Sequence, residues 1–251
     1  PDDSFSTTPY EKGFQLLYYL ESLIGEAQMQ ELLRSYILAN QQTSVTYDVF
    51  VDAFNAYVDQ NFTQAEASAI KAAMDFNEWI FGPGLPPVHL DFTTTALNAS
   101  KALADKYVEL AGDASPDNFE DFKGYYSGLQ VVFIEKLVAE QANLTQAILA
   151  RIDADLNLTN TLDPECKERW LPLGLRLGYE PAKEPAHAFI SEQGRLKYLQ
   201  PVYKALLDSG LKETAEAWFE ENVNFYHPLA VDKLRKMIAG YSVQGRLALV
   251  Q

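Results

Sequence analysis

The sequence has few residues of the kinds that bind metals or form disulfides. Of its 251 residues, one is a cysteine, Cys166, and three are histidines, His89, His187 and His227, which lie far apart. A lone cysteine excludes a disulfide within the chain, and the histidine spacing matches no metal-binding motif. The sequence therefore predicts a chain without a disulfide framework and without a metal site of its own.

Long apolar runs and an excess of basic residues are also lacking. No apolar stretch approaches the ~18 residues that cross a bilayer, and 20 basic against 35 acidic residues give a net charge of −15. Nucleic acids and anionic membrane surfaces bind clustered Lys and Arg, so we expect neither as a partner. A hydrophobic content of 47% instead indicates a globular protein, long enough for one large or two ordinary domains.

The chain opens at Pro1-Asp2-Asp3, with no initiator methionine and no signal peptide. Such an opening is typical of the middle of a loop, and we expect the chain to be a fragment of a longer protein. The expected compartment is the cytoplasm, but a targeting segment cannot be read from a chain whose true N-terminus is missing.

Helical periodicity runs through the sequence, and the alternation typical of strands is absent. A first helix is predicted from Pro9 to about Ile24, and a capping box of Thr63 and Glu66 predicts another that reaches Trp79. Cap residues, prolines and terminal glycines then predict helices over residues 95–111, 116–125, 127–141, 144–157, 163–177, 184–193, 197–209, 211–224 and 227–239.

A segment rich in proline and glycine separates two groups of predicted helices. Residues 82–87 cannot continue a helix, so residues 82–94 are expected to form an extended linker between a region of residues 1–81 and a domain of residues 95–251. The predicted fold class is all-α. The paired helices of the second region favour a two-layer α-solenoid similar to HEAT or armadillo repeats, and an irregular helical bundle is the alternative.

The start of the first helix carries a tyrosine in an unusual place. Thr8 and Glu11 form a capping box, and Pro9 suits the first helical position because its missing N–H costs nothing there. Tyr10 then lies in the first turn, where a phenol can point out of the helix end toward a site. Taken alone, a tyrosine in this place is more often an ordinary half-buried packing residue.

Several motifs, in this order along the chain, make the sequence resemble the M1 family of zinc aminopeptidases, and most of all its leukotriene A4 hydrolase branch. The resemblance spans most of the chain. The segments that carry it are residues 9–14 (PYEKGF), 77–80 (NEWI), 83–87 (PGLPP), 192–197 (EQGRLK) and 226–228 (YHP).

The resemblance implies the C-terminal part of a zinc aminopeptidase that removes N-terminal residues from short peptides. Residues 1–81 would be the last helices of a thermolysin-like catalytic domain, and residues 95–251 the helical C-terminal domain. Zinc would belong to the full-length enzyme and not to this fragment, which we expect to be inactive. Its partners would be the N-terminal and catalytic regions of the same parent chain and short peptide substrates.

For the first region, the resemblance implies a catalytic residue and two residues of the substrate channel. Tyr10 would donate a hydrogen bond to the oxyanion that forms during peptide hydrolysis. Pro1 and Asp2 match a pair that lines the channel, although a Pro-Asp-Asp loop is also ordinary turn sequence. Phe5 stands where leukotriene A4 hydrolases have a second tyrosine, which argues against epoxide hydrolysis and leaves peptide hydrolysis unaffected.

For the second region, the resemblance implies that Arg195 and Lys197 bind the free carboxylate of the substrate. An arginine fork suits a carboxylate, and a lysine adds a mobile point charge. The alternative is two solvated surface cations. His227 is expected to shape a helix start, and Cys166 to be a small core residue.

A function from another class is also open at this stage. A non-catalytic helical scaffold would bind a protein partner on its concave face. Such a scaffold would give Tyr10 and Arg195 no special position, whereas an aminopeptidase requires both.

Overall fold

In the computed structural model, which describes residues 8–241, α-helices and short 3-10 turns account for all the regular structure of the described residues. The expectation of an all-α fold is therefore confirmed. The chain divides into two compact units between Phe92 and Thr93, and each is described by itself. No helix of residues 8–241 is long and apolar enough to cross a membrane.

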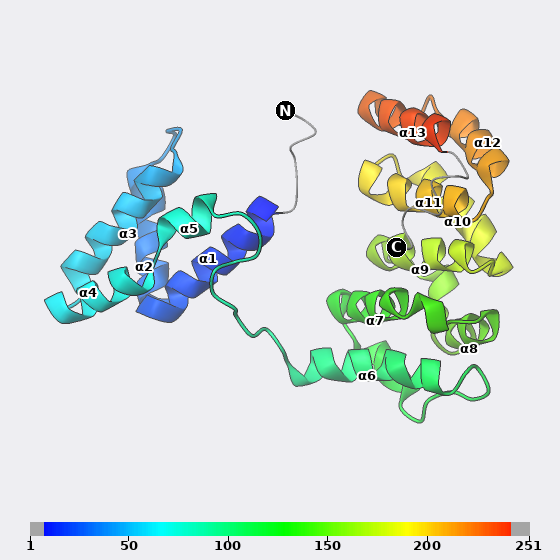
Figure 1. The fold of residues 1–251 in the computed structure, drawn as a ribbon, viewed down its shortest axis with the longest axis horizontal. Coiled ribbons are helices and arrows are strands. Elements are labelled where there is room, and N and C mark those ends of the chain that lie inside the picture. The colour runs from blue at the N-terminus through cyan, green and yellow to red at the C-terminus, as the bar shows by residue number, and fades with distance from the viewer. Residues whose placement is uncertain (1–7, 242–251) are drawn as a thin grey trace. The chain divides into compact units, whose positions relative to one another are not determined.

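The first unit is a set of helices that pack in sequence order, α1 on α2, α2 on α3 and α3 on α4 (Figure 1). Its core contains Leu20 of α1 and Phe54 and Val58 of α3, all without exposed surface. The helices are α1 (Thr8–Ile24), α2 (Glu26–Ala39), α3 (Tyr47–Asn61), α4 (Gln64–Ala73) and α5 (Phe76–Phe81).

Two predicted boundaries in this unit differ from the structure. The helix expected to run from residue 64 to Trp79 is broken, because the Asp75 side chain accepts a hydrogen bond from the Glu78 N–H and starts α5 as a separate helix. The capping box of Thr63 and Glu66 at the start of α4 is confirmed. The α1 helix begins at Thr8, one residue before the predicted start, and ends at Ile24 as expected.

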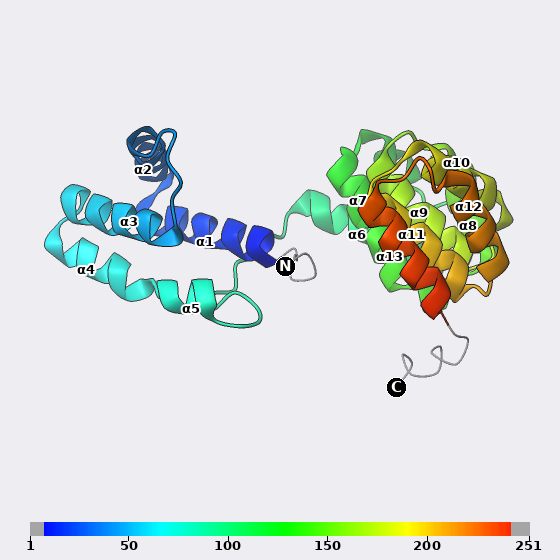
Figure 2. The same ribbon diagram turned by 90° about the horizontal axis from the view of Figure 1, so that it is seen from above.

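The second unit stacks helices in two layers, with α6, α7, α9, α11 and α13 one above another in Figure 1 and α8, α10 and α12 beside them; Figure 2 gives the same helices from above. The helices are α6 (Thr95–Glu109), α7 (Ser127–Ala139), α8 (Gln146–Leu156), α9 (Pro164–Arg176), α10 (Lys183–Glu192), α11 (Leu196–Asp208), α12 (Lys212–Asn222) and α13 (Pro228–Gly240). The helix predicted over residues 116–125 is wrong, since only a 3-10 segment, Phe119–Gly124, forms there.

The central helix of this unit is α9, which packs against α7, α10 and α11. Five consecutive residues of α9, from Leu171 to Leu175, are buried, as expected of a helix covered on all sides. Trp170, also fully buried, donates from its indole N–H to the Thr159 hydroxyl at 3.0 Å. This bond ties the middle of α9 to the 3-10 segment that precedes it, Leu158–Asn160, and the first turns of α9 carry the acidic residues of the site described below.

Candidate functional site

Tyr10 lies in the first turn of α1, and the residue is 65% exposed. The prediction that Tyr10 is not a core residue is thus consistent with its surroundings. Two other aromatic residues of the same helix, Phe14 and Tyr18, are also exposed, and both rings contact Phe92, with centroids 5.6 and 5.1 Å away. An aromatic surface therefore extends along α1 from the turn that carries Tyr10.

Lys12, two residues after Tyr10, ties the start of α1 to the end of α5. Its ammonium donates to the Gly82 carbonyl oxygen at 2.6 Å and approaches the Glu78 carbonyl oxygen at 3.5 Å. These carbonyls lie at a helix C-terminus, where a cation is favoured. The contact joins two motifs 66 to 70 residues apart in sequence, which sequence reasoning did not connect.

The end of α5 is packed so closely that it helps to fix this contact. Trp79 is buried and stacks on the Tyr19 ring of α1, with centroids 5.7 Å apart, while the Tyr19 hydroxyl donates to the Ala73 carbonyl oxygen at 3.1 Å. The first turn of α1 is therefore held by the Lys12 contact at one end and by aromatic packing further along. Tyr10 is presented from a supported helix.

The predicted cation pair lies at the start of α11. Arg195 is the residue just before the helix, and Lys197 is the second residue of the helix. Both cations lie beside the ring of Tyr198. The Lys197 ammonium is 5.4 Å and the Arg195 guanidinium carbon 5.8 Å from the ring centroid, distances at which a cation is attracted to an aromatic face. The structure thus brings Arg195 and Lys197 together on one tyrosine.

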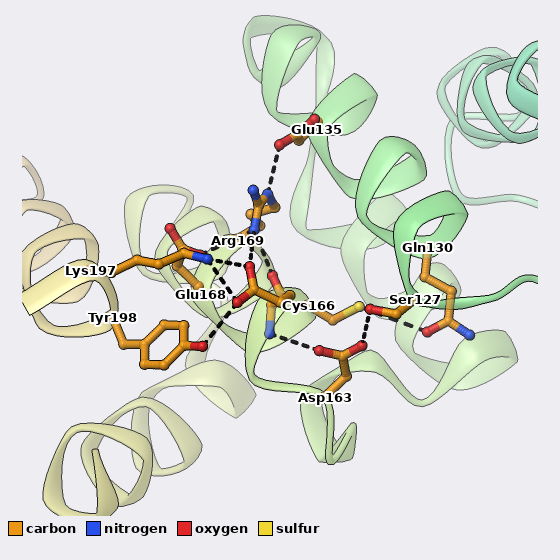
Figure 3. A network of polar contacts seen from close by, with 10 residues as sticks. Ser127, Gln130, Glu135, Asp163, Cys166, Glu168, Arg169, Lys197 and Tyr198 are labelled. Atoms are coloured by element: carbon orange, nitrogen blue, oxygen red, sulfur yellow. Dashed lines mark hydrogen bonds and ion pairs between the residues drawn. The ribbon is translucent and has the colours of Figure 1, made fainter. Parts of the chain in front are cut away.

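Glu165, in the first turn of α9, is the centre of a polar network across α7, α9 and α11 (Figure 3). Its carboxylate accepts from the Lys197 ammonium at 2.7 and 2.5 Å and from the Tyr198 hydroxyl at 2.9 Å. The Asp163 side chain caps α9 by accepting from the Glu165 N–H at 2.8 Å. These bonds from Lys197 hold the pKa of the Glu165 carboxyl below its usual value, against an opposing effect of burial.

Glu168 and Arg169 complete the network on the next turn of α9. The Arg169 guanidinium lies 3.1 Å from Glu168 and 2.8 Å from Glu135 of α7, and the Lys197 ammonium is 3.8 Å from Glu168. Burial raises the pKa of Glu168 although both cations oppose this. Three carboxyl groups therefore surround two cations, and Lys197 is paired with two of them, Glu165 and Glu168.

Arg195 differs from Lys197 in its partners. Within residues 8–241, Arg195 has no carboxylate partner, and its side chain contacts the Tyr198 ring at the exposed start of α11. An exposed guanidinium without an acidic partner can accept a carboxylate from a ligand through two parallel hydrogen bonds. Glu165 and Tyr198, which organise this region, were missed by sequence reasoning because they lie on different helices.

The remaining predicted residues fall into three groups. Pro1, Asp2 and Phe5 lie outside the described residues. His227 caps α13, its Nδ1 accepting from the Leu229 N–H at 3.2 Å, which confirms the expected structural function. Cys166 is fully buried, also as expected, and burial raises the pKa of its thiol to about 12.

Possible metal ligands do not converge anywhere in the part of the chain that the structure describes. No group of three or more His, Cys, Asp and Glu side chains there could hold a metal ion. The described residues therefore do not fit a zinc site, because a zinc ion needs three or four such ligands at one point.

Comparison with known proteins identifies two family regions. Residues 1–76 match the peptidase family M1 domain, and residues 125–238 match the C-terminal domain of leukotriene A4 hydrolase. Proteins named leucine aminopeptidase 2 from Ajellomyces capsulatus and Aspergillus clavatus are each 31% identical over 96% of this chain. A leukotriene A-4 hydrolase homolog from Botryotinia fuckeliana is 31% identical over 94% of it.

The matched chain spans 38% of the length of the two leucine aminopeptidases and 35% of the leukotriene A-4 hydrolase homolog. The peptidase M1 match covers the helix that carries Tyr10, and the leukotriene A4 hydrolase match covers the residues that include Arg195, with residues 77–124 between the two matches. The chain therefore belongs to the M1 peptidase family and carries, over residues 125–238, the leukotriene A4 hydrolase type of C-terminal domain.

Proposed function

We propose that these 251 residues form part of an aminopeptidase that removes N-terminal residues from short peptides. The observation that carries this proposal is the pair of family matches, since a peptidase M1 region and a leukotriene A4 hydrolase C-terminal region follow each other in one chain. Relatives over 96% of the chain are named leucine aminopeptidases, which supports peptide bonds as the target. Phe5 argues against an epoxide as a second substrate.

Within this enzyme, Tyr10 would act as a hydrogen-bond donor to the oxyanion of the tetrahedral intermediate. The exposed position of its side chain and the anchoring of α1 by Lys12 support this assignment. A donor of this kind accelerates hydrolysis because its bond is stronger in the transition state than in the ground state. It must be held in place beforehand, and the contact of Lys12 with the end of α5 would do so.

The test is Tyr10→Phe in the active enzyme that contains residues 1–251. We expect kcat to fall by ~10²-fold or more with a smaller change in KM, as is typical when one oxyanion donor is removed. Tyr18→Phe is the matched control, since Tyr18 is an exposed tyrosine of the same helix, and it should leave kcat nearly unchanged. A Tyr10→Phe enzyme that keeps more than about half of the wild-type kcat would refute the assignment.

Arg195 would bind the free carboxylate at the C-terminal end of a short peptide. Its guanidinium is exposed and has no carboxylate partner within residues 8–241, and it is positioned by the Tyr198 ring. Binding energy gained far from the scissile bond also orients that bond, so Arg195 should contribute to kcat as well as to KM.

We expect Arg195→Ala to lower kcat/KM for tripeptides with a free carboxylate by more than tenfold, a loss typical of a charge-assisted pair. Tripeptide amides and aminoacyl arylamides, which lack that carboxylate, should lose much less. Arg235→Ala is the control, because Arg235 is also an exposed arginine next to an aromatic ring, Phe219. Equal losses on free-acid and capped substrates would show that Arg195 supports the structure instead of recognising the carboxylate.

A further inference from the structure

Lys197 and Arg195 sit beside the same ring but are in different electrostatic situations. Two contacts of 2.5 and 2.7 Å direct the Lys197 ammonium at the two oxygens of Glu165, and Glu168 lies 3.8 Å away. An ammonium has three N–H donors, so most of the hydrogen-bonding capacity of Lys197 is already used. Arg195 has no carboxylate partner within residues 8–241.

The balance of charge in the network also sets Lys197 apart. Glu135, Glu165 and Glu168 contribute three negative charges when ionised, and Arg169 and Lys197 contribute two positive ones, which leaves −1. Removing Lys197 would leave a net charge of −2 in the network, beside the Tyr198 ring that Arg195 contacts. A substrate carboxylate near Arg195 would then be repelled, since charges near a protein surface still interact over several ångströms.

Tyr198, the second partner of Glu165, connects the charge of Glu165 to Arg195. The Tyr198 hydroxyl donates to Glu165 at 2.9 Å, and the ring of the same tyrosine contacts the Arg195 guanidinium. Glu165 therefore holds both the neutralising cation and the aromatic surface under Arg195. A single carboxylate organises the charge and the geometry of the start of α11.

We propose that Glu165 is a specificity-determining positioning residue and that Lys197 acts as its counter-ion, shielding the substrate carboxylate from Glu165 and leaving direct recognition to Arg195. This inference rests on the proposed function of Arg195. It differs from direct binding by Lys197, because a counter-ion becomes unnecessary once the charge that it neutralises is gone.

A double-mutant cycle of Lys197→Met and Glu165→Gln in the active enzyme separates the two possibilities. Lys197→Met alone should raise KM for a free-acid tripeptide about fivefold or more, and in the Glu165→Gln background it should change KM by less than about twofold. The double variant restores the network charge of −1, and the glutamine still accepts the Tyr198 hydrogen bond. The corresponding tripeptide amide should show little change in any variant.

Direct binding by Lys197 predicts instead that Lys197→Met costs the same factor or a larger one in the Glu165→Gln background, and either result would overturn the inference. Lys204→Met is the matched control, since Lys204 lies on the same helix and pairs with Asp208 at 2.8 Å, and it should not affect KM. The Arg195→Ala enzyme is measured alongside. If Arg195→Ala fails to discriminate between free-acid and amide substrates, the proposed function has failed, whereas a selective Arg195 effect with additive Lys197 and Glu165 effects refutes the inference alone.

Discussion

Two glutamates one turn apart on α9 have pKa values that move in opposite directions. Hydrogen bonds from Lys197 lower the pKa of Glu165 despite its partial burial, whereas burial raises the pKa of Glu168 despite its cationic neighbours. A lowered pKa means that folding favours the ionised form, and a raised pKa means that folding favours the neutral form. The charge of Glu165 therefore stabilises the folded protein at neutral pH, and the charge of Glu168 destabilises it.

This contrast predicts opposite effects for two conservative substitutions. Glu165→Gln should lower the free energy of unfolding at pH 7, and Glu168→Gln should raise it. The loss from Glu165→Gln should disappear as the pH falls from the ordinary value of 4.5 through the lowered folded-state pKa, because wild-type Glu165 is then protonated in both states. The gain from Glu168→Gln should shrink as the pH falls through the raised folded-state pKa toward 4.5 and should be gone below that value, where both states hold the proton.

Urea unfolding followed by far-ultraviolet circular dichroism, over a series of pH values from 7 down to about 3, would measure both effects. Shifts of the two variants in the same direction at pH 7 would contradict this account. Shifts of opposite sign that persist unchanged over this whole pH range would show that the glutamates act through packing and not through charge.

The network also shows what the sequence could and could not predict about the candidate site. Arg195 and Lys197 are two residues apart at a helix start, so their proximity was predictable. Their difference was not, because Glu165 lies 32 residues from Lys197 and meets it only through the packing of α9 on α11. Lys12 and Gly82, 70 residues apart, were unpredictable for the same reason. Local chemistry is readable from sequence, whereas partners across helices depend on the fold.

For whole elements, prediction succeeded where the chain carries explicit end signals. Asp163 and Pro164 start α9 as cap and first residue, and Gly210 follows the end of α11 with a φ of 77°, a conformation that favours glycine. Leu211 donates to the Leu206 carbonyl oxygen at 2.8 Å and closes that helix end. Prediction failed at Asp75, where a capping aspartate interrupts an apolar pattern with no proline or glycine to mark the break.

The joint between α1 and α5 leads to a prediction about two glycines. A Cβ atom on Gly82 would lie 2.4 Å from the Glu78 backbone oxygen, so Gly82→Ala must displace the carbonyls that Lys12 contacts. We expect Gly82→Ala to lower the free energy of opening of the contact between α1 and α5 by ~1–3 kcal/mol. A Cβ atom on Gly13, inside α1, would meet nothing within 4 Å, and Gly13→Ala should stabilise the helix by ~0.5–1 kcal/mol.

Hydrogen exchange of the amides of α1 and α5 gives a local measurement, because changes elsewhere in the chain do not mask it. Gly82→Ala should reduce protection in both helices, and Gly13→Ala should increase it in α1. Equal protection in the Gly82→Ala and wild-type proteins would mean that α5 can end without the close approach seen at this joint.

At the scale of the whole molecule, the family relationship implies zinc, whereas the described residues lack the ligands for a zinc ion. M1 aminopeptidases are zinc enzymes, but the described residues bring no three possible ligands together. Two of the three histidines are already used. His187 stacks on Trp218 and contacts Glu221 at 2.8 Å, while His227 caps α13. His89 lies exposed in the extended segment before the second unit.

We therefore expect the polypeptide of residues 1–251, purified and dialysed after exposure to zinc, to retain far less than one zinc ion per chain and to leave aminoacyl arylamides intact. Weak binding by separate carboxylates is lost on dialysis, whereas a site with three or four converging ligands keeps its metal. Elemental analysis against protein concentration gives the stoichiometry, with an active leucine aminopeptidase treated in the same way as the positive control. One tightly held zinc ion per chain would contradict the prediction, and the His187→Ala, His227→Ala and His89→Ala variants would then show which histidine binds it.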